Sequence, residues 1–248
     1  MTFIKHLVFI VLFFAMHISV MAGPPFVTDD PEPVEYQHWE INQATLLNHN
    51  VNGWNGAATL TDSNYGMLPN LQLSFQPSVA LNIPSSGPAE VGYGDTELGA
   101  KYRFIQQTDM LPDVACYPLL ELPTGSASRG LGAGHPQVYL PIWMQKDFGK
   151  WSTFGGGGYW INPGTYSMNW WYAGWAAQYQ VADHLALGAE VFHQTRQDVD
   201  DASSTRINVG GTWDLNDEEH ILFSAGHTVQ GQSAYLGYLA IQFTFGSK

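Results

Sequence analysis

Hydrophobic and polar residues alternate one by one along most of this chain. The pattern is clearest in residues 234–246, where Leu239, Ile241 and Phe243 fall on one face of an extended segment and Gln242 falls on the other. A period of two is typical of a β-strand with one apolar and one polar face. A strand in a membrane barrel requires such faces, because lipid lies outside the barrel and water inside. The pattern therefore predicts a strand that crosses a membrane.

Similar alternation recurs in about twelve segments, each close to the 9–11 residues that cross a bilayer at a tilt. We predict an all-β fold, a single closed antiparallel transmembrane β-barrel, because closure satisfies every backbone donor and acceptor in lipid. Tight turns alternate with longer polar loops, as expected if each kind lies at its own end of the barrel. The connection expected at residues 62–70 fits this alternation poorly. The predicted strands span residues 38–49, 54–61, 71–82, 95–106, 113–122, 136–147, 151–161, 168–181, 184–195, 204–215, 219–229 and 234–246.

Five charged residues are predicted to face the lumen: Glu97, Lys101, Arg103, Glu121 and Glu190. A basic residue that faces lipid at mid-depth costs about 2–4 kcal/mol, whereas a position in the lumen costs little. We expect Lys101 and Arg103 to form a ladder of opposite charges with Glu121 or Glu190, and this ladder would shape a polar constriction that selects solutes. The alternative is that these charges pair to stabilise a narrow, filled interior.

Tryptophans gather near the predicted strand ends and on the outward faces. Girdles at the two membrane interfaces explain most of them, including Trp171 and Trp175. Trp160 and Trp170 are the candidates to point inward. They could stack an aromatic solute near the external mouth.

The N-terminus indicates export. Lys5, the apolar run of residues 7–14 and the small-residue site that ends at Ala22 are typical of a signal peptide, predicted at residues 1–22. The acidic, proline-rich segment of residues 23–37 is either a periplasmic tail or a segment that enters the lumen and contacts Lys101 and Arg103. The barrel would then comprise residues 38–248, in the outer membrane of a Gram-negative cell.

Composition excludes several other classes of protein. Asp and Glu number 22 against 9 Lys and Arg, which argues against nucleic acid as a partner. Cys116 is the single cysteine, so no internal disulfide can form. The histidines match no compact metal motif. The glycine run of residues 155–158 precedes no helix and no lysine, so it predicts a bend or a close backbone approach rather than a nucleotide site. We predict no catalytic residue, metal or cofactor, and no enzyme activity.

Five segments carry a resemblance to a known family. They are residues 23–33 (GPPFVTDDPEP), 39–42 (WEIN), 92–104 (GYGDTELGAKYRF), 121–125 (ELPTG) and 153–162 (TFGGGGYWIN). Together they resemble the outer-membrane transporters labelled for the meta-pathway of phenol degradation. The resemblance implies an outer-membrane barrel that takes up aromatic or other hydrophobic molecules, and it implies no catalytic residue.

These observations predict a channel for passive or facilitated passage of small hydrophobic or aromatic molecules through the lumen. The expected partners are outer-membrane lipid, the solute, and the barrel-assembly machinery, which would bind the C-terminal strand although residues 246–248 follow its last aromatic residue. Two alternatives stay open. One is a structural barrel with a filled lumen, and the other is a secreted soluble β-sandwich that carries a ligand.

Overall fold

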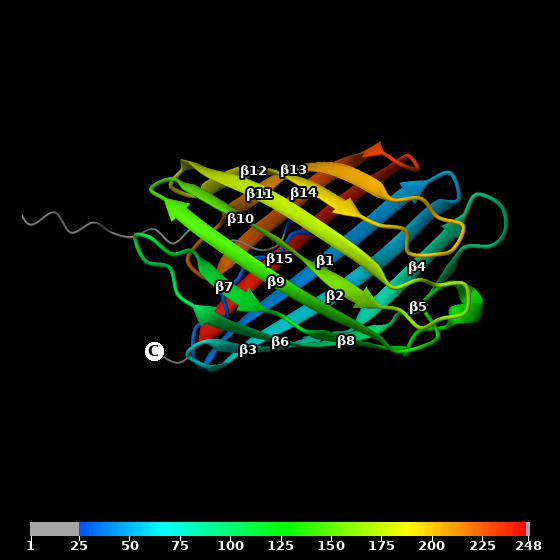
Figure 1. Cartoon of the computed structure of the whole chain (residues 1–248), viewed down its shortest axis with the longest axis horizontal. Coiled ribbons are helices and arrows are strands. Elements are labelled where there is room, and N and C mark those ends of the chain that lie inside the picture. Colours follow the sequence, from blue (N-terminus) through cyan, green and yellow to red (C-terminus); the bar gives the residue numbers. More distant parts are fainter. Residues whose placement is uncertain (1–24, 247–248) are drawn as a thin grey trace, which may run out of the picture.

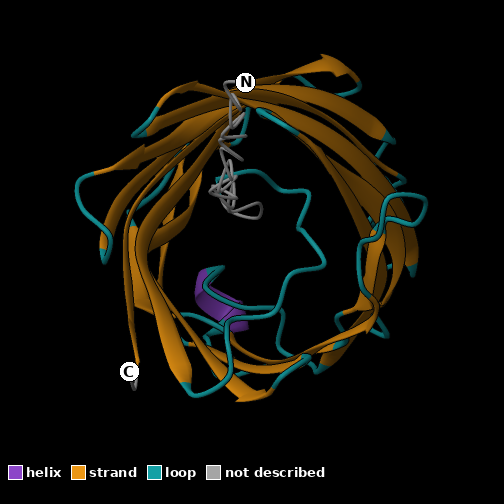
Figure 2. Cartoon of the chain, turned by 90° about the vertical axis from the view of Figure 1, so that its left-hand side faces the viewer, coloured by secondary structure: helices purple, strands orange, loops and turns teal. Residues whose placement is uncertain are grey.

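The computed structural model describes residues 25–246, which form one antiparallel sheet that closes on itself. Closure occurs at β1 (His38–Asn50), which pairs on one side with β2 (Gly53–Leu68) and on the other with β15 (Ala234–Gly246). Figures 1 and 2 show the resulting barrel from the side and along its length. The predicted closed barrel is therefore confirmed, while the predicted signal peptide at residues 1–22 lies outside the described residues.

The fifteen β-segments make twelve wall strands, because three strands are interrupted. Pro77 separates β3 (Leu71–Gln76) from β4 (Ser78–Pro84), and Pro118 lies between β7 (Asp113–Cys116) and β8 (Leu119–Leu122). Proline has no N–H to donate to the ladder, which accounts for both of these breaks. The third break separates β5 (Glu90–Tyr93) from β6 (Thr96–Ile105). The remaining strands are β9 (Gln137–Phe148), β10 (Trp151–Ile161), β11 (Trp170–Ala182), β12 (Leu185–Gln194), β13 (Ser204–Asp214) and β14 (Glu219–Gln230).

One predicted element is wrong. The second strand was expected at residues 54–61 with a loop at 62–70, but β2 continues to Leu68. Its second half contains Asn64, which is polar yet buried, because its side-chain oxygen accepts hydrogen bonds from Gln72 and Ser74 of β3. Both faces of the strand are polar at residues 61–64, which is why this segment was expected to be a loop.

The outer face of the barrel is apolar and uncovered. Trp171 is 60% exposed and Trp175 is 51% exposed, whereas Tyr172 and Gln178 on the inward face of the same strand are buried. This confirms the predicted faces. The alternative of a soluble β-sandwich is wrong, because no second sheet covers the aromatic face in the part of the chain that the structure describes.

The two ends of the barrel differ. At the termini end, where β1 begins and β15 ends, several connections are tight turns, such as residues 149–150 and 183–184. At the opposite end, the loop end, the longest connection is residues 123–136, which contains the 3-10 helix η1 (Ala127–Arg129) (Figure 1). No helix among residues 25–246 is long and apolar enough to cross a membrane.

Candidate functional site

Residues 25–37, here called the lumen segment, enter the barrel: most of residues 25–34 are buried or half-buried inside it, and residues 35–37 are exposed where the segment joins β1. The carbonyl oxygen of Pro25 accepts a hydrogen bond from Ser224 Oγ at 2.6 Å, which places one end of the segment against β14. The side chain of Phe26 packs against Phe154 on β10 and Ala176 on β11. Thr28 is fully buried. The segment therefore occupies part of the lumen rather than extending away from the barrel.

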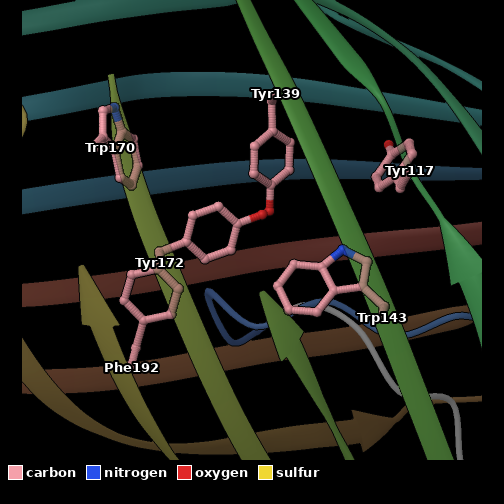
Figure 3. Close-up of a cluster of buried hydrophobic side chains, with 6 residues drawn as sticks. All are labelled: Tyr117, Tyr139, Trp143, Trp170, Tyr172 and Phe192. Carbon is pink, nitrogen blue, oxygen red and sulfur yellow. The ribbon is translucent and has the colours of Figure 1, made fainter. Parts of the chain in front are cut away.

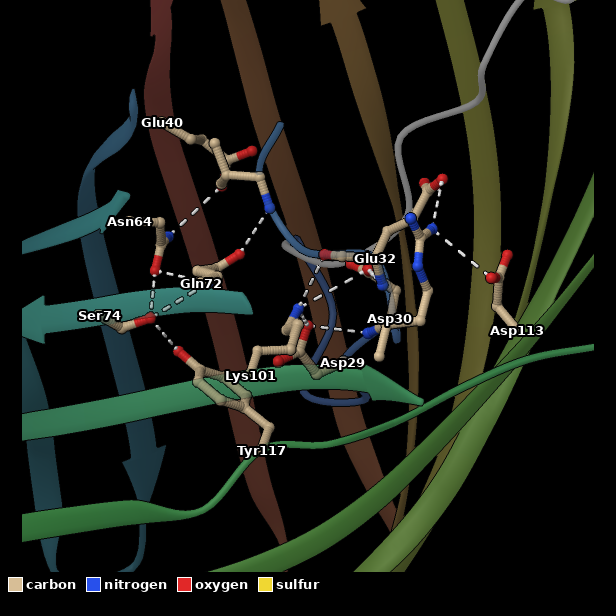
Figure 4. Close-up of polar contacts among 12 residues, drawn as sticks. Asp29, Asp30, Glu32, Glu40, Asn64, Gln72, Ser74, Lys101, Asp113 and Tyr117 are labelled. Atoms are coloured by element: carbon tan, nitrogen blue, oxygen red, sulfur yellow. Dashed lines mark hydrogen bonds and ion pairs between the residues drawn. The ribbon is translucent and has the colours of Figure 1, made fainter. Parts of the chain in front are cut away.

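Lys101 fastens the lumen segment to β6 (Figure 4). Its Nζ lies 3.1 Å from Asp29 Oδ1 and 3.7 Å from Asp30 Oδ1, and its side chain is only 5% exposed. Burial raises the pKa of the Asp30 carboxyl above its usual range, and the positive charge of Lys101 opposes that shift. A buried ammonium without a partner would be strongly destabilising, so these contacts explain how Lys101 can point inward.

Arg103 makes a second attachment in the same half of the lumen. Its Nη1 lies 3.7 Å from Glu32 Oε1 and 3.5 Å from Asp113 Oδ1. Burial raises the pKa of Glu32, and the charge of Arg103 opposes that shift. The predicted pairing of Lys101 and Arg103 with Glu121 or Glu190 is therefore wrong, because the lumen segment brings its own carboxylates to these two cations.

Glu190 anchors the other part of the lumen segment. Its carboxylate accepts hydrogen bonds from the backbone N–H of Val27 at 3.2 Å and of Thr28 at 2.5 Å, and from Asn208 Nδ2 at 2.5 Å. Glu190 is 1% exposed. Gly174 faces the same point, where a Cβ atom would collide with Thr28 Oγ1. The structure thus places Glu190 against the segment instead of in an open path.

The other four predicted residues lie toward the loop end. Glu97 and Glu121 are register partners on β6 and β8. Glu121 Oε1 accepts a hydrogen bond from Gln137 Nε2 at 2.7 Å, and Gln137 Oε1 accepts one from Trp160 Nε1 at 2.5 Å. Trp160 in turn stacks on Trp170, with ring centroids 5.2 Å apart and planes 14° from parallel. Gln137, which sequence reasoning missed, therefore joins Glu121 to Trp160.

A cluster of buried rings lines the lumen in this half, and we call it the lumen aromatic cluster (Figure 3). Tyr172 is at its centre, 5.0 Å from Tyr139 and 5.4 Å from Phe192 between ring centroids. Leu119 and Trp160 pack against the cluster. Its members are Tyr117, Tyr139, Trp143, Trp170, Tyr172 and Phe192.

The glycine run in β10 makes room for these rings. A Cβ atom on Gly156 would lie 2.9 Å from Trp143 Cε3, and one on Gly158 would lie 2.7 Å from Tyr172 Oη. Ordinary side chains would therefore displace both rings. The close approach expected at residues 155–158 is confirmed, and this run was the sequence signal that could have located Trp143 and Tyr172.

A cavity of about 730 Å³ connects the two halves of the lumen. Tyr139 and Trp143 of the lumen aromatic cluster form part of its wall, and Lys101 lines it toward the termini end. Its opposite wall is formed by leucines of β1, β2, β14 and β15, namely Leu46, Leu60, Leu222 and Leu236. Arg103 lines a smaller hollow of about 400 Å³ with Glu32 and Glu35.

The part of the cavity nearer the termini end is lined by carboxylates. Glu40 and Asp62 line it, and both accept hydrogen bonds from Asn42 Nδ2 at 3.2 Å. Asp29 and Asp30 line it from the lumen segment. Among residues 25–246 there is no group of three or more His, Cys, Asp or Glu side chains that could hold a metal ion. The arrangement can bind or pass a solute.

The fold is that of outer-membrane channels. An outer membrane channel from Pseudomonas putida F1 superposes with a TM-score of 0.65 at 16% identity, over 86% of this chain and 97% of that chain. The KdgM porin in complex with disordered oligogalacturonate superposes with a TM-score of 0.57 at 9% identity, over 84% and 99%. The NanC porin gives 0.56 at 8% identity, over 83% and 98%. No curated protein matches the sequence.

The sequence itself assigns the family. Residues 40–245 match the family model described as MetA-pathway of phenol degradation, and the chain belongs to this family. The match confirms the resemblance seen in the sequence, and it spans nearly the whole barrel.

Proposed function

We propose that this protein is an outer-membrane channel that lets small hydrophobic or aromatic molecules pass through its lumen. The observation that carries the proposal is the apolar part of the cavity wall, where Tyr139 and Trp143 face leucines across the lumen. The rest of the lining is polar or charged. An apolar wall of this kind suits a solute that gains free energy by leaving water.

The size of the cavity fits this class of solute. Small-molecule sites typically enclose about 300–1,000 Å³, and the cavity of about 730 Å³ falls in that range. Tyr139 and Trp143 offer ring faces and edges to a planar solute. A solute must bind well enough to enter and weakly enough to leave, which stacking and apolar contact without a fixed ion pair can provide.

The charged residues of the cavity wall narrow the class of solute further. Glu40 and Asp62 line the cavity toward the termini end, so an anionic solute would meet like charge on its way through. Lys101 does not offset them as a free cation, because Asp29 and Asp30 already pair with it. We therefore infer that neutral aromatic molecules pass better than aromatic carboxylates.

Uptake by cells tests this proposal. Cells that lack other small-solute channels would express the protein and receive ring-labelled phenol or benzoate at low micromolar concentration, at a pH where benzoate is ionised. We expect faster uptake of phenol than in cells with an empty vector, and little gain for benzoate. Trp143→Ala should slow phenol uptake by roughly fivefold, since an aromatic contact contributes about 1 kcal/mol.

The matched control is Trp175→Ala on the outward face, which should leave uptake unchanged once its assembly into the membrane equals that of the wild type. Equal phenol uptake in expressing and vector cells would refute the proposal.

The lumen segment favours one second function, a structural barrel with a filled lumen. Its ion pairs and hydrogen bonds span the lumen from β6 to β14. That function predicts conductance indistinguishable from bare membrane in planar bilayers for the wild type. A measurable current through the wild type would argue against it.

A further inference from the structure

The longest loop folds back into the mouth of the barrel. Residues 123–136, here called the mouth loop, leave β8 at the loop end and return to β9. Figure 1 places their η1 helix at that end, and Figure 2 shows η1 inside the ring of strands when the barrel is viewed along its length. The mouth loop therefore narrows the entrance instead of extending beyond it.

Asp95 holds both ends of the mouth loop. Its Oδ1 accepts a hydrogen bond from Gly125 N at 2.8 Å, and its Oδ2 accepts one from Ala133 N at 2.6 Å. Thr124 Oγ1 adds a bond to the carbonyl of Gly94 at 2.8 Å. Asp95 lies in the break between β5 and β6. Hydrogen bonds to a carboxylate are about twice as strong as neutral ones, so this one side chain holds the two ends of the loop together. We call the two bonds from Gly125 N and Ala133 N to Asp95 the clasp.

The surrounding glycines fit this clasp. A Cβ atom on Gly132 would collide with the Asp95 carboxylate, and one on Gly125 would collide with the loop's own backbone at Leu131. Leu131 is only 3% exposed and packs over Gly92, where a Cβ atom would lie 3.1 Å from Leu131 Cδ1. The loop is thus packed against the inward face of β5 as well as bonded to Asp95.

Two weaker ties lie nearer the rim. Arg129 pairs with Glu90 at 2.6 Å, but both side chains are substantially exposed, so solvent screens this pair. His135 Nε2 lies 2.6 Å from Asn162 Oδ1 and connects the mouth loop to the next loop along the chain. Within the loop, Leu131 N donates to Ser126 O at 3.0 Å, and Asp95 is the side chain that joins residues 125 and 133.

We propose that the mouth loop, clasped by Asp95, is a fixed constriction that sets the largest solute able to enter the lumen. The proposal rests on the proposed channel function. A loop of this length without such ties would be mobile and could not impose a sharp size limit. Asp95 is a positioning residue, because it acts by holding the loop and not by touching the solute.

The test uses the full-length protein and two readouts. Limited trypsin digestion of the folded protein, followed by mass spectrometry, measures cleavage after Arg129 in the mouth loop. Single-channel conductance with polyethylene glycols of increasing mass measures the largest molecule that enters. Asp95→Ala removes both acceptors. Asp200→Ala makes the same charge change in an exposed loop at the same end and is the matched control.

We expect Asp95→Ala to raise the rate of cleavage after Arg129 by about tenfold or more, because charge-assisted bonds are lost. The variant should also admit larger polymers, while Asp200→Ala behaves as the wild type. Gly132→Ala provides a second variant that displaces the clasp and keeps the charge, so it should show the same two changes.

The other outcomes separate the two proposals. Cleavage that rises without any change in the polymer limit overturns the constriction and leaves the channel function intact, and so does a mouth loop that stays uncut in both clasp variants. Absence of current in all proteins, with the mouth loop cut in the variants, overturns the channel function itself.

Discussion

The two halves of the lumen are built on the same strands but filled by opposite chemistry. In the termini half, Lys101 and Arg103 hold the lumen segment through ion pairs. In the loop half, the lumen aromatic cluster packs around Tyr172, and its Tyr139 and Trp143 border the cavity that continues along the lumen segment. The alternation of inward and outward residues along the wall is the same in both halves. The difference teaches that a barrel pattern determines which residues face inward, and the chemistry of those residues determines what packs against them.

Energetics explains why the lumen segment lies in the charged half. A cation that points into a narrow lumen requires a partner, because an unpaired buried charge is strongly destabilising. Lys101 obtains two carboxylates from the lumen segment. Aromatic rings need no such partner and pack on one another, as Tyr139 does on Tyr172. The charged half therefore depends on the lumen segment, while the aromatic half packs without it.

Among the variants that distinguish the two halves of the lumen, Lys101→Met should have the largest effect. This change leaves Asp29 and Asp30 unpaired and should weaken docking of the lumen segment by roughly 3 kcal/mol, about a hundredfold in the docking equilibrium. Hydrogen exchange at the backbone amides of residues 27–34, followed by mass spectrometry, measures the released segment. Lys150→Met at an exposed turn is the matched control. Exchange as slow as in the wild type would contradict our account of the termini half.

A smaller effect should follow from pH, and only in the termini half. Burial raises the pKa of Asp30 and of Glu32, so the docked segment binds protons more tightly than the released one. The resulting stabilisation is complete below the ordinary carboxyl pKa and is lost as the pH rises through the raised values. We expect release, measured as single-channel conductance, to increase with pH, and Asp30→Asn to flatten this profile. Release on acidification instead would show that the ion pairs with Lys101 outweigh burial.

The smallest effect should be seen in the loop half with Tyr172→Phe. The Tyr172 hydroxyl is buried without a hydrogen-bond partner, so its removal should leave stability unchanged or raise it by less than about 1 kcal/mol. Tyr117→Phe is the contrasting variant, because the Tyr117 hydroxyl donates to Ser74 Oγ at 2.8 Å and its loss should cost about 1 kcal/mol. Unfolding by urea in detergent micelles measures both. A marked loss of stability in Tyr172→Phe would mean that its hydroxyl has a partner.

Much of the wall could be predicted from the chain. Trp171 and Trp175 were assigned to the lipid face by alternation alone, and both are exposed on the outer surface. The second strand was the exception, since the inward residues Asp62 and Asn64 are polar and look like a loop. Alternation reports a face only where the two faces differ in polarity, and here the outward residues Thr61 and Ser63 are polar as well.

The lumen contents could not be predicted in the same way. Glu190 and Val27 are bonded although they are 163 positions apart, and Ser224 and Pro25 are 199 apart. No local pattern connects such residues. The sequence showed that Lys101 and Arg103 face inward and that residues 23–37 are acidic, which left two arrangements open for that segment.

The amino-acid sequence by itself determined the barrel, its approximate strand number and the lipid face, because these follow from a period of two that every strand carries locally. Tertiary structure alone decided that the lumen segment pairs with Lys101, that Asp95 clasps the mouth loop, and that Trp143 and Tyr172 meet over the glycines of β10. The physical reason is closure. Residues far apart in the chain face one another across the lumen only after the last strand has paired with the first.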